Sequence, residues 1–132
     1  MFTLQQMKAA HAKVKTGADF PEYVKEIKSL GLQYYEFFVT DGRTIYHGAD
    51  GFSVNGHAIY PEKEIAIAAS PDAVKQIISG HQQGKSNFLT FCELVASAGV
   101  EKWVVDAQTM LCSYYDLDGN VMVAEPIPDG AY

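Results

Sequence analysis

The sequence predicts an α+β fold in which two helical hairpins pack on a mainly antiparallel sheet. Two observations lead to this class. Residues 3–31 and 70–99 carry apolar side chains at helical spacing, and each region is followed by segments in which apolar and polar residues alternate. The order ααβββ is therefore expected twice in 132 residues, and this length fits a single domain over residues 1–132.

End signals bound the first helical hairpin. Thr3 and Gln6 form a capping box, in which each side chain bonds to the backbone of the other residue, and Gly17 is expected to end this helix. The second helix begins shortly before Pro21, whose missing N–H costs nothing in a first turn, and Gly31 ends it in a left-handed conformation. Its apolar stripe consists of Phe20, Tyr23, Val24, Ile27 and Leu30.

The apolar period then changes from helical to alternating. In LQYYEFFVTDG, one face of the predicted strand carries Tyr35, Phe37 and Val39, and the other carries Tyr34, Glu36 and Phe38. Asp-Gly pairs at 41–42 and 50–51 predict turns on either side of a second strand, RTIYHG. FSVNGHAIY predicts a further hairpin, because Asn-Gly favours the positive φ angles of a tight turn. EIAIAA predicts one more short strand.

The second half repeats this order. A helix begins at Pro71 and is broken by Gly84, and the next helix is capped by Ser86 or Asn87 and ended by Gly99. The polar segment HQQGKSNF is therefore a helix junction, because a phosphate-binding loop would follow a strand and contain more glycine. The strands VEKWVVDA, TMLCSYYD and VMVAE follow. DLDGN before the last strand is a hairpin turn, since it lacks the downstream glutamate of a calcium loop.

The two halves also align residue by residue. An ungapped offset of 68 residues pairs Phe20 with Phe88 and gives six identities over the 33 positions from 19 to 51, where average composition gives about two. Near matches fall at predicted core positions: Tyr23 with Phe91, Ile27 with Val95, Tyr35 with Trp103, and Phe37 with Val105. We therefore expect an approximate internal duplication, with repeats over about residues 3–54 and 70–124.

Charge and cysteine content argue against several classes of protein. The net charge is −6 and Arg43 is the only arginine, whereas nucleic-acid binders cluster Lys and Arg against phosphate. No apolar run is long enough to cross a bilayer and no signal-peptide pattern is present, so a cytoplasmic location is expected. Cys92 and Cys112 have no second ligand nearby, so neither a disulfide nor a zinc site is predicted.

His11 and His81 are the first candidates for a ligand site. Each lies on the apolar side of its helix near the C-terminal end, and a twofold relation between the halves would bring both to one cleft. Tyr35 and Trp103 hold matching repeat positions and are candidates for an aromatic wall of that cleft. The structural alternative is that the histidines bond to backbone carbonyls, or are protonated and favoured by the helix C-terminal dipole, and that the aromatic rings pack the core. Two histidines make a poor metal site, so no metal or cofactor is predicted.

Tyr34, Phe38 and Val104 lie on the opposite face of the predicted sheet. Four helices leave part of a sheet of about six strands uncovered, so this face is a candidate interaction surface, with a homodimer as its simplest form. No Ser-His-Asp, Cys-His or paired-carboxylate arrangement is visible at a diagnostic spacing, so no catalytic residue is assigned.

Three segments carry a resemblance to a known family: FTLQQMKAAHAKVKTGADFPEYVKEIKSLG, HQQGKSNFLTFCELVASAGVEKWVVD and CSYYDLDGN. With them the chain resembles bacterial domain-of-unknown-function family 1398 from Phe2 to about Pro126, and GVEKWVVD is the most specific stretch. Proteins of this family are often labelled phage envelope protein and often lie in prophage regions. The resemblance implies a stand-alone cytoplasmic domain and carries over no catalytic residue.

Together these observations favour a non-enzymatic binding or regulatory module that acts through protein contacts or a homodimer. The alternative is a small-ligand or metal-binding protein, or an enzyme, with a cleft near His11 and His81. The alternative predicts a pocket that contains at least one of these histidines with a perturbed pKa.

Overall fold

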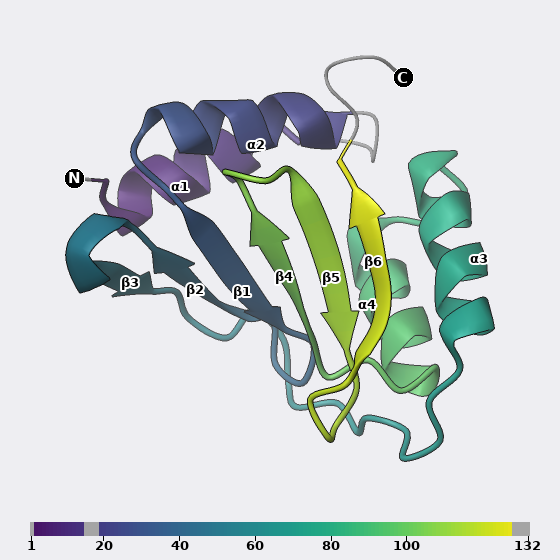
Figure 1. Ribbon diagram of the computed structural model, residues 1–132. Helices are drawn as coiled ribbons and strands as arrows, with labels where there is room; N and C mark the ends of the chain where they lie inside the picture. Colours follow the sequence, from purple (N-terminus) through teal and green to yellow (C-terminus); the bar gives the residue numbers. More distant parts are fainter. Residues whose placement is uncertain (1, 15–18, 128–132) are drawn as a thin grey trace.

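The computed structural model describes residues 2–14 and 19–127 and has the predicted class, with four helices and a six-stranded antiparallel sheet (Figure 1). The first half contains α1 (Leu4–His11), α2 (Phe20–Ser29), β1 (Tyr34–Phe38), β2 (Arg43–His47), the short 3-10 turn η2 (Ala49–Gly51) and β3 (Ser53–Asn55). The second half contains α3 (Pro71–Gln82), α4 (Phe88–Ser97), β4 (Lys102–Asp106), β5 (Leu111–Tyr115) and β6 (Val121–Pro126).

Strand order in the sheet is β3-β2-β1-β4-β5-β6, so the two halves meet at the β1–β4 pair. All four helices lie on one face, with α1 and α2 over the β1–β2 end and α3 and α4 over the β5–β6 end (Figure 1). The strand side chains that face the helices are the buried ones, as the alternation in LQYYEFFVTDG predicted. The core therefore lies between the helical layer and this single face of the sheet.

Local end signals account for the helices. The capping box of α1 is present, with the Gln6 N–H donating to Thr3 Oγ1 at 3.1 Å. The Asn87 side chain accepts from the Thr90 N–H at 2.8 Å and caps α4. Gly31, Gly84 and Gly99 adopt the positive φ angles expected after α2, α3 and α4. The predicted end of the first helix at Gly17 lies outside the described residues, and α1 itself ends at His11.

The hairpin predicted for FSVNGHAIY is wrong. β3 ends at Asn55, and the Gly56 N–H donates to the Thr44 carbonyl at 2.7 Å, which continues the pairing with β2. The chain then leaves the sheet, and the Ile59 N–H donates to the Asp41 carbonyl at 2.9 Å. Bonds to the β1–β2 turn thus replace the strand pairing that Asn-Gly would have supported.

The strand predicted for EIAIAA is also wrong. Ile65 is buried and Ile67 is 93% exposed, so the alternation is real, but this segment pairs with none of the strands in the described part of the chain. Instead the Ala66 N–H donates to the Ala96 carbonyl at 3.0 Å. The last carbonyls of α4 lack partners within their own helix, and the Ala96 carbonyl accepts from this segment as well as from the Gly99 N–H at 3.1 Å.

The internal duplication stays a prediction, and the strand registers support it. Glu36 lies opposite Val104 in the β1–β4 pair, and these residues are counterparts under the offset of 68. The pairing of Tyr34 with His47 between β1 and β2 becomes, under the same offset, the pairing of Lys102 with Tyr115 between β4 and β5. An approximate twofold axis would then pass through the centre of the sheet.

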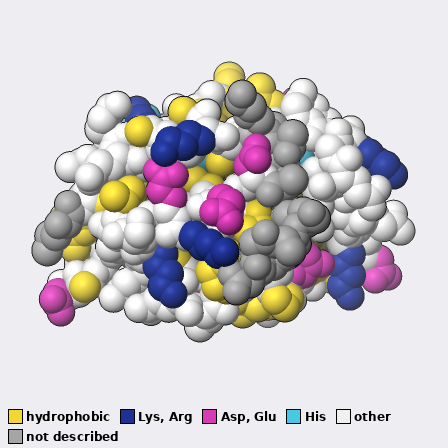
Figure 2. Space-filling view, turned by 90° about the horizontal axis from the view of Figure 1, so that it is seen from above, with side chains coloured by type: hydrophobic (Ala, Val, Ile, Leu, Met, Phe, Trp, Pro, Cys, Tyr) yellow, Lys and Arg dark blue, Asp and Glu magenta, His cyan; other side chains and the backbone are white. Residues whose placement is uncertain are grey.

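No helix in the described ranges, 2–14 and 19–127, is long and apolar enough to span a membrane. From above, the molecule shows acidic and basic side chains interspersed (Figure 2). Two ion pairs on the first helical hairpin join Lys13 to Glu26 at 2.9 Å and Lys25 to Glu22 at 3.8 Å. Mixed charge of this kind is typical of a solvated helix face.

Candidate functional site

A cavity of about 350 Å³ lies between the sheet and the two helical hairpins. Its floor is the buried face of β1, β2, β4 and β5, and its walls come from α1 and α2 on one side and α3 and α4 on the other. All four residues predicted as ligand-binding candidates, His11, His81, Tyr35 and Trp103, line this one cavity. Ligand pockets in proteins have volumes of roughly 300–1,000 Å³, so the cavity is large enough for a small organic molecule.

Trp103 lies at the centre of the cavity floor. Its ring stacks on Phe37, with centroids 4.3 Å apart and planes at 18°, and meets the edge of Phe91 at 5.5 Å. Phe88 stands nearly perpendicular to Trp103 at 6.2 Å. These rings come from β1, β4 and α4, so both halves of the chain build one aromatic surface beneath the cavity.

His81 is fixed on the α3–α4 wall. Its ring stacks on Phe91 with centroids 4.4 Å apart, and its Nδ1 lies 3.0 Å from the backbone carbonyl oxygen of Ser86. Burial lowers the pKa of His81, and the bond to Ser86 opposes that shift. The imidazole is therefore neutral near pH 7, and its backbone bond is the kind that the structural alternative predicted for this histidine.

His11 lies on the opposite wall, at the end of α1. Its ring is exposed on one side and meets the edges of Tyr23 at 5.5 Å and Phe88 at 5.9 Å. Desolvation by these neighbours lowers the pKa of His11. The His11 ring makes no hydrogen bond within residues 2–14 and 19–127, and its contact with Phe88 bridges the two halves at the rim of the cavity.

Three phenol groups from the first half, on α2, β1 and β2, gather at one end of the cavity. The Tyr35 ring lies 6.2 Å from Tyr23 and 5.9 Å from Tyr46. Burial raises the pKa of each of these three phenols, and the neighbouring Tyr46 raises that of Tyr23 further. All three therefore keep their protons at neutral pH, and Tyr23 and Tyr46 share a side-chain hydrogen bond.

Formal charge is confined to the cavity rim. The described residues include no buried charged side chain, and the charged residues that line the cavity are the exposed Lys8 and the half-buried Glu125. No group of three or more His, Cys, Asp or Glu among the described residues could hold a metal ion. Burial raises the pKa of the Cys112 thiol in the floor to about 12, so it stays protonated. The lining thus favours a neutral ligand, because burying an unpaired charge is costly.

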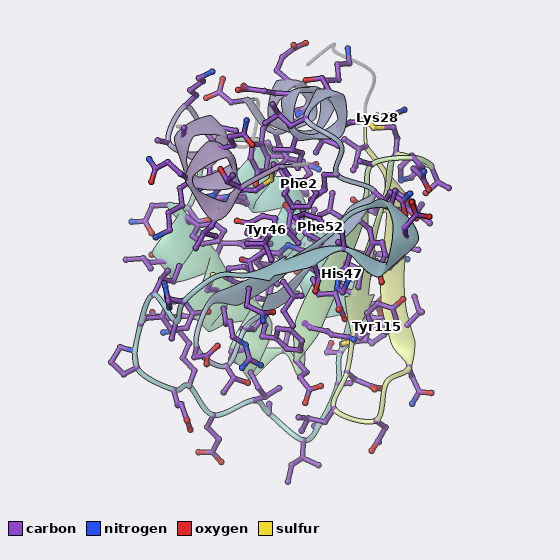
Figure 3. All side chains as sticks on the ribbon, turned by 90° about the vertical axis from the view of Figure 1, so that its left-hand side faces the viewer. Phe2, Lys28, Tyr46, His47, Phe52 and Tyr115 are labelled. Carbon is purple, nitrogen blue, oxygen red and sulfur yellow. The ribbon has the colours of Figure 1, made fainter. Side chains whose placement is uncertain are left out.

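The predicted interaction surface lies on the face of the sheet that the helices leave uncovered. Tyr34, Phe38 and Val104 are half-buried there, and Figure 3 shows Tyr46 toward the helical layer while His47 and Tyr115 lie on the uncovered side. Aromatic and basic groups alternate along it: the Tyr34 ring stacks on His47 at 4.2 Å and the Lys102 ammonium lies 5.8 Å from the Phe38 ring centre.

Glu36 stands at the centre of this uncovered face. Its carboxylate oxygens lie 2.9 Å from Lys102 Nζ and 2.9 Å from His47 Nε2. Burial alone would raise the pKa of Glu36, but the hydrogen bonds and charges of Lys102 and His47 outweigh it and the pKa lies below its usual value. The uncovered face therefore carries an ionic network between its aromatic side chains.

Several cavity residues were not among the predicted candidates. The repeat alignment contained a signal for them, because counterparts under the offset of 68 occur in pairs around the cavity: Phe20 with Phe88, Tyr23 with Phe91, Thr44 with Cys112, and Tyr46 with Tyr114. The predicted pair Tyr35 and Trp103 follows the same rule. Under the same offset His57 corresponds to Glu125, which also lines the cavity, but both lie outside the aligned positions 19–51 and only the structure places them there.

Two comparisons place the chain among known proteins. The family model described as "Protein of unknown function (DUF1398)" matches residues 8–126. The chain is also similar to an uncharacterised protein of Escherichia coli strain K12, YcgX, with 26% identity over 117 residues that cover 87% of this chain and 86% of YcgX. Neither description mentions a phage or an envelope, so that label stays a prediction.

Proposed function

The chain belongs to the DUF1398 family, whose function is unknown, and we propose from the cavity that it is a small-molecule-binding protein. The observation that carries the proposal is the cavity of about 350 Å³ with an aromatic floor built by both halves of the chain. Pockets that bind small molecules are mostly apolar, with a few polar groups that orient the ligand. His11, His81 and the buried phenols are those polar groups here.

Binding is favoured over catalysis by the state of the polar groups. His81 lies 3.1 Å from Ser86 Oγ, which resembles a nucleophile and its base, but the same Nδ1 points at the Ser86 carbonyl oxygen, which can only accept. Nδ1 therefore carries a proton and cannot remove one from the hydroxyl. The Cys112 thiol is protonated as well, since burial raises its pKa to about 12.

The fluorescence of Trp103 tests this proposal directly. Trp103 is the only tryptophan of the chain and forms the centre of the cavity floor, so a ligand in the cavity changes its emission. A screen of neutral aromatic and aliphatic compounds, read by this emission and by the melting temperature, should find compounds that change both. If no compound changes either signal, the proposal is wrong.

A cavity-filling variant shows where a compound binds. Thr44 lines the cavity, and Thr44→Phe would place a ring inside it, so affinity should fall at least ~10-fold, or about 1.4 kcal/mol. Ile45→Phe is the matched control, because Ile45 precedes Tyr46 on the same strand and faces the uncovered side of the sheet. If both variants lose the same affinity for the compound, or if Thr44→Phe loses none, the compound binds outside the cavity.

A second candidate function is a protein-interaction or homodimer surface at Tyr34, Phe38 and Val104. The half-buried aromatic residues on the uncovered face support it. We rank it second, because the ionic network of Glu36 occupies the centre of that face, where stable interfaces are depleted of charge. Sedimentation of the wild type and of Phe38→Glu tests it: a dimer that the substitution dissociates would support it, and a monomer would leave the homodimer without support.

A further inference from the structure

The proton position on His81 limits the chemistry of the cavity's ligand. The Ser86 carbonyl oxygen accepts from Nδ1 at 3.0 Å, so in the neutral ring the proton sits on Nδ1 and the lone pair sits on Nε2. The stack on Phe91 at 4.4 Å holds the plane of the ring, and the bond to Ser86 fixes its rotation. Nε2 is therefore an oriented hydrogen-bond acceptor.

This acceptor has no partner within residues 2–14 and 19–127. The hydrogen bonds of His81 in that part of the chain use Nδ1 alone, and no buried side-chain nitrogen or oxygen there lacks a partner, so Nε2 remains accessible. His81 lines the cavity, beside Phe88 and Phe91. A ligand in the cavity therefore meets an unused acceptor next to an aromatic surface.

Size and charge narrow the ligand class further. An apolar protein cavity of ~150 Å³ holds benzene, so about 350 Å³ accommodates two fused rings or one ring with a substituent. Flat rings suit the stacked and edge-on aromatic side chains around Trp103. Because the described lining holds no buried charge, a neutral molecule is favoured over an anion or a cation.

We infer that the cavity selects a neutral aromatic molecule that carries an N–H or O–H group, and that His81 Nε2 accepts the hydrogen bond from it. This inference rests on the proposed small-molecule function and names the ligand class for that cavity. His81 is a specificity-determining residue in this account: an aromatic compound without the donor fits the same space but leaves the acceptor unpaired.

Indole and 1-methylindole form a suitable pair of probes, because they share the ring system and only indole carries an N–H. Binding is measured by calorimetry, and the side-chain N–H resonance of Trp103, the only tryptophan, reports by NMR that the probe is in the cavity. The wild type should bind indole about 10-fold more tightly than 1-methylindole, a difference of about 1.4 kcal/mol, because only indole can donate a hydrogen bond to His81 Nε2.

Variants then assign the preference to His81. His81→Phe keeps a ring against Phe91 but removes both nitrogens, so it should bind the two probes with similar affinity. If that variant fails to fold, His81→Leu serves the same purpose. His47→Phe is the matched control on the uncovered face of the sheet and should keep the wild-type preference.

The outcomes separate the inference from the proposed function. Equal affinity of the wild type for both probes, or a preference that survives in His81→Phe, would overturn the role of His81. Binding of other compounds in the Trp103 screen, with no binding of either indole, would overturn the ligand class and leave the small-molecule function in place. If no compound of any class binds, the proposed function is wrong and the inference falls with it.

Discussion

Filling the cavity should stabilise the protein in the absence of ligand. Thr44 is half-buried and faces the cavity, so the ring of Thr44→Phe can enter space that no side chain occupies. Burying a phenylalanine side chain contributes roughly 1.5–3 kcal/mol. The substitution also removes the Thr44 hydroxyl from beside the Tyr46 phenol, at a cost of about 1 kcal/mol. The free energy of unfolding should therefore rise by about 1 kcal/mol, within the usual range for cavity-filling changes.

Val105→Phe is the matched comparison on the same sheet face. Val105 is 0% exposed and does not line the cavity, so a larger ring there overpacks the core and should cost roughly 1–3 kcal/mol. Urea denaturation of both variants measures the difference, provided that their m values match that of the wild type. If Thr44→Phe is destabilised as much as Val105→Phe, the space beside Thr44 is not open and the account of the cavity is wrong.

Three further predictions concern the fold and its charges. Gly99→Ala should lower the free energy of unfolding more than Gly84→Ala. Both glycines have positive φ, but a Cβ on Gly99 would lie 2.8 Å from Ala69 Cα, whereas a Cβ on Gly84 would meet no atom within 4 Å. Chemical denaturation measures both variants, and an equal fall in the free energy of unfolding would refute the close approach at Gly99. Glu36→Gln should lower the free energy of unfolding at pH 7 by about 1 kcal/mol. Lys102 and His47 hold the pKa of folded Glu36 below 4.5, so the stability difference between wild type and variant should vanish as the pH falls below 4.5 and through the pKa of the folded state. A stability difference that stays constant down to pH 2 would contradict the ionic network. Burial lowers the pKa of folded His81 below 6.5, so this residue takes up a proton more readily in the unfolded chain, and the melting temperature should fall as the pH drops below 6.5. The melting temperature of His81→Phe should fall less over the same pH range. An equal fall in the variant would refute this effect of burying His81.

The helices could be predicted from the sequence because their end signals are local. A capping box at Thr3, an Asn cap at position 87 and glycines after the last turns each act within a few residues, and the structure shows them where expected. The alternation in β1 was equally reliable, since it reports which side chains face the core.

The errors occur where the partner of a segment lies far along the chain. Asn55-Gly56 has the composition of a tight turn, but Gly56 bonds to Thr44 and the following residues bond to the β1–β2 turn. EIAIAA alternates like a strand, but the end of α4 takes up one of its N–H donors. Neither competition is visible in a local pattern, because both depend on tertiary contacts.

The sequence predicted part of the candidate site. The apolar face of each helix and the repeat positions pointed to His11, His81, Tyr35 and Trp103, and the structure brings these four to one cavity. The tautomer of His81 could not be predicted, because it depends on how the α3–α4 junction folds back to present the Ser86 carbonyl. The size of the cavity likewise depends on how far apart the two helical hairpins lie on the sheet.

The most direct test of the small-molecule account is a set of ¹H–¹⁵N NMR spectra recorded with neutral aromatic compounds. We expect the Trp103 side-chain N–H and the backbone signals of residues around His81 and Phe88 to shift together, while those of the β5–β6 turn, residues 116–120, stay in place. Shifts confined to the uncovered face, or no shifts with any compound, would contradict the account.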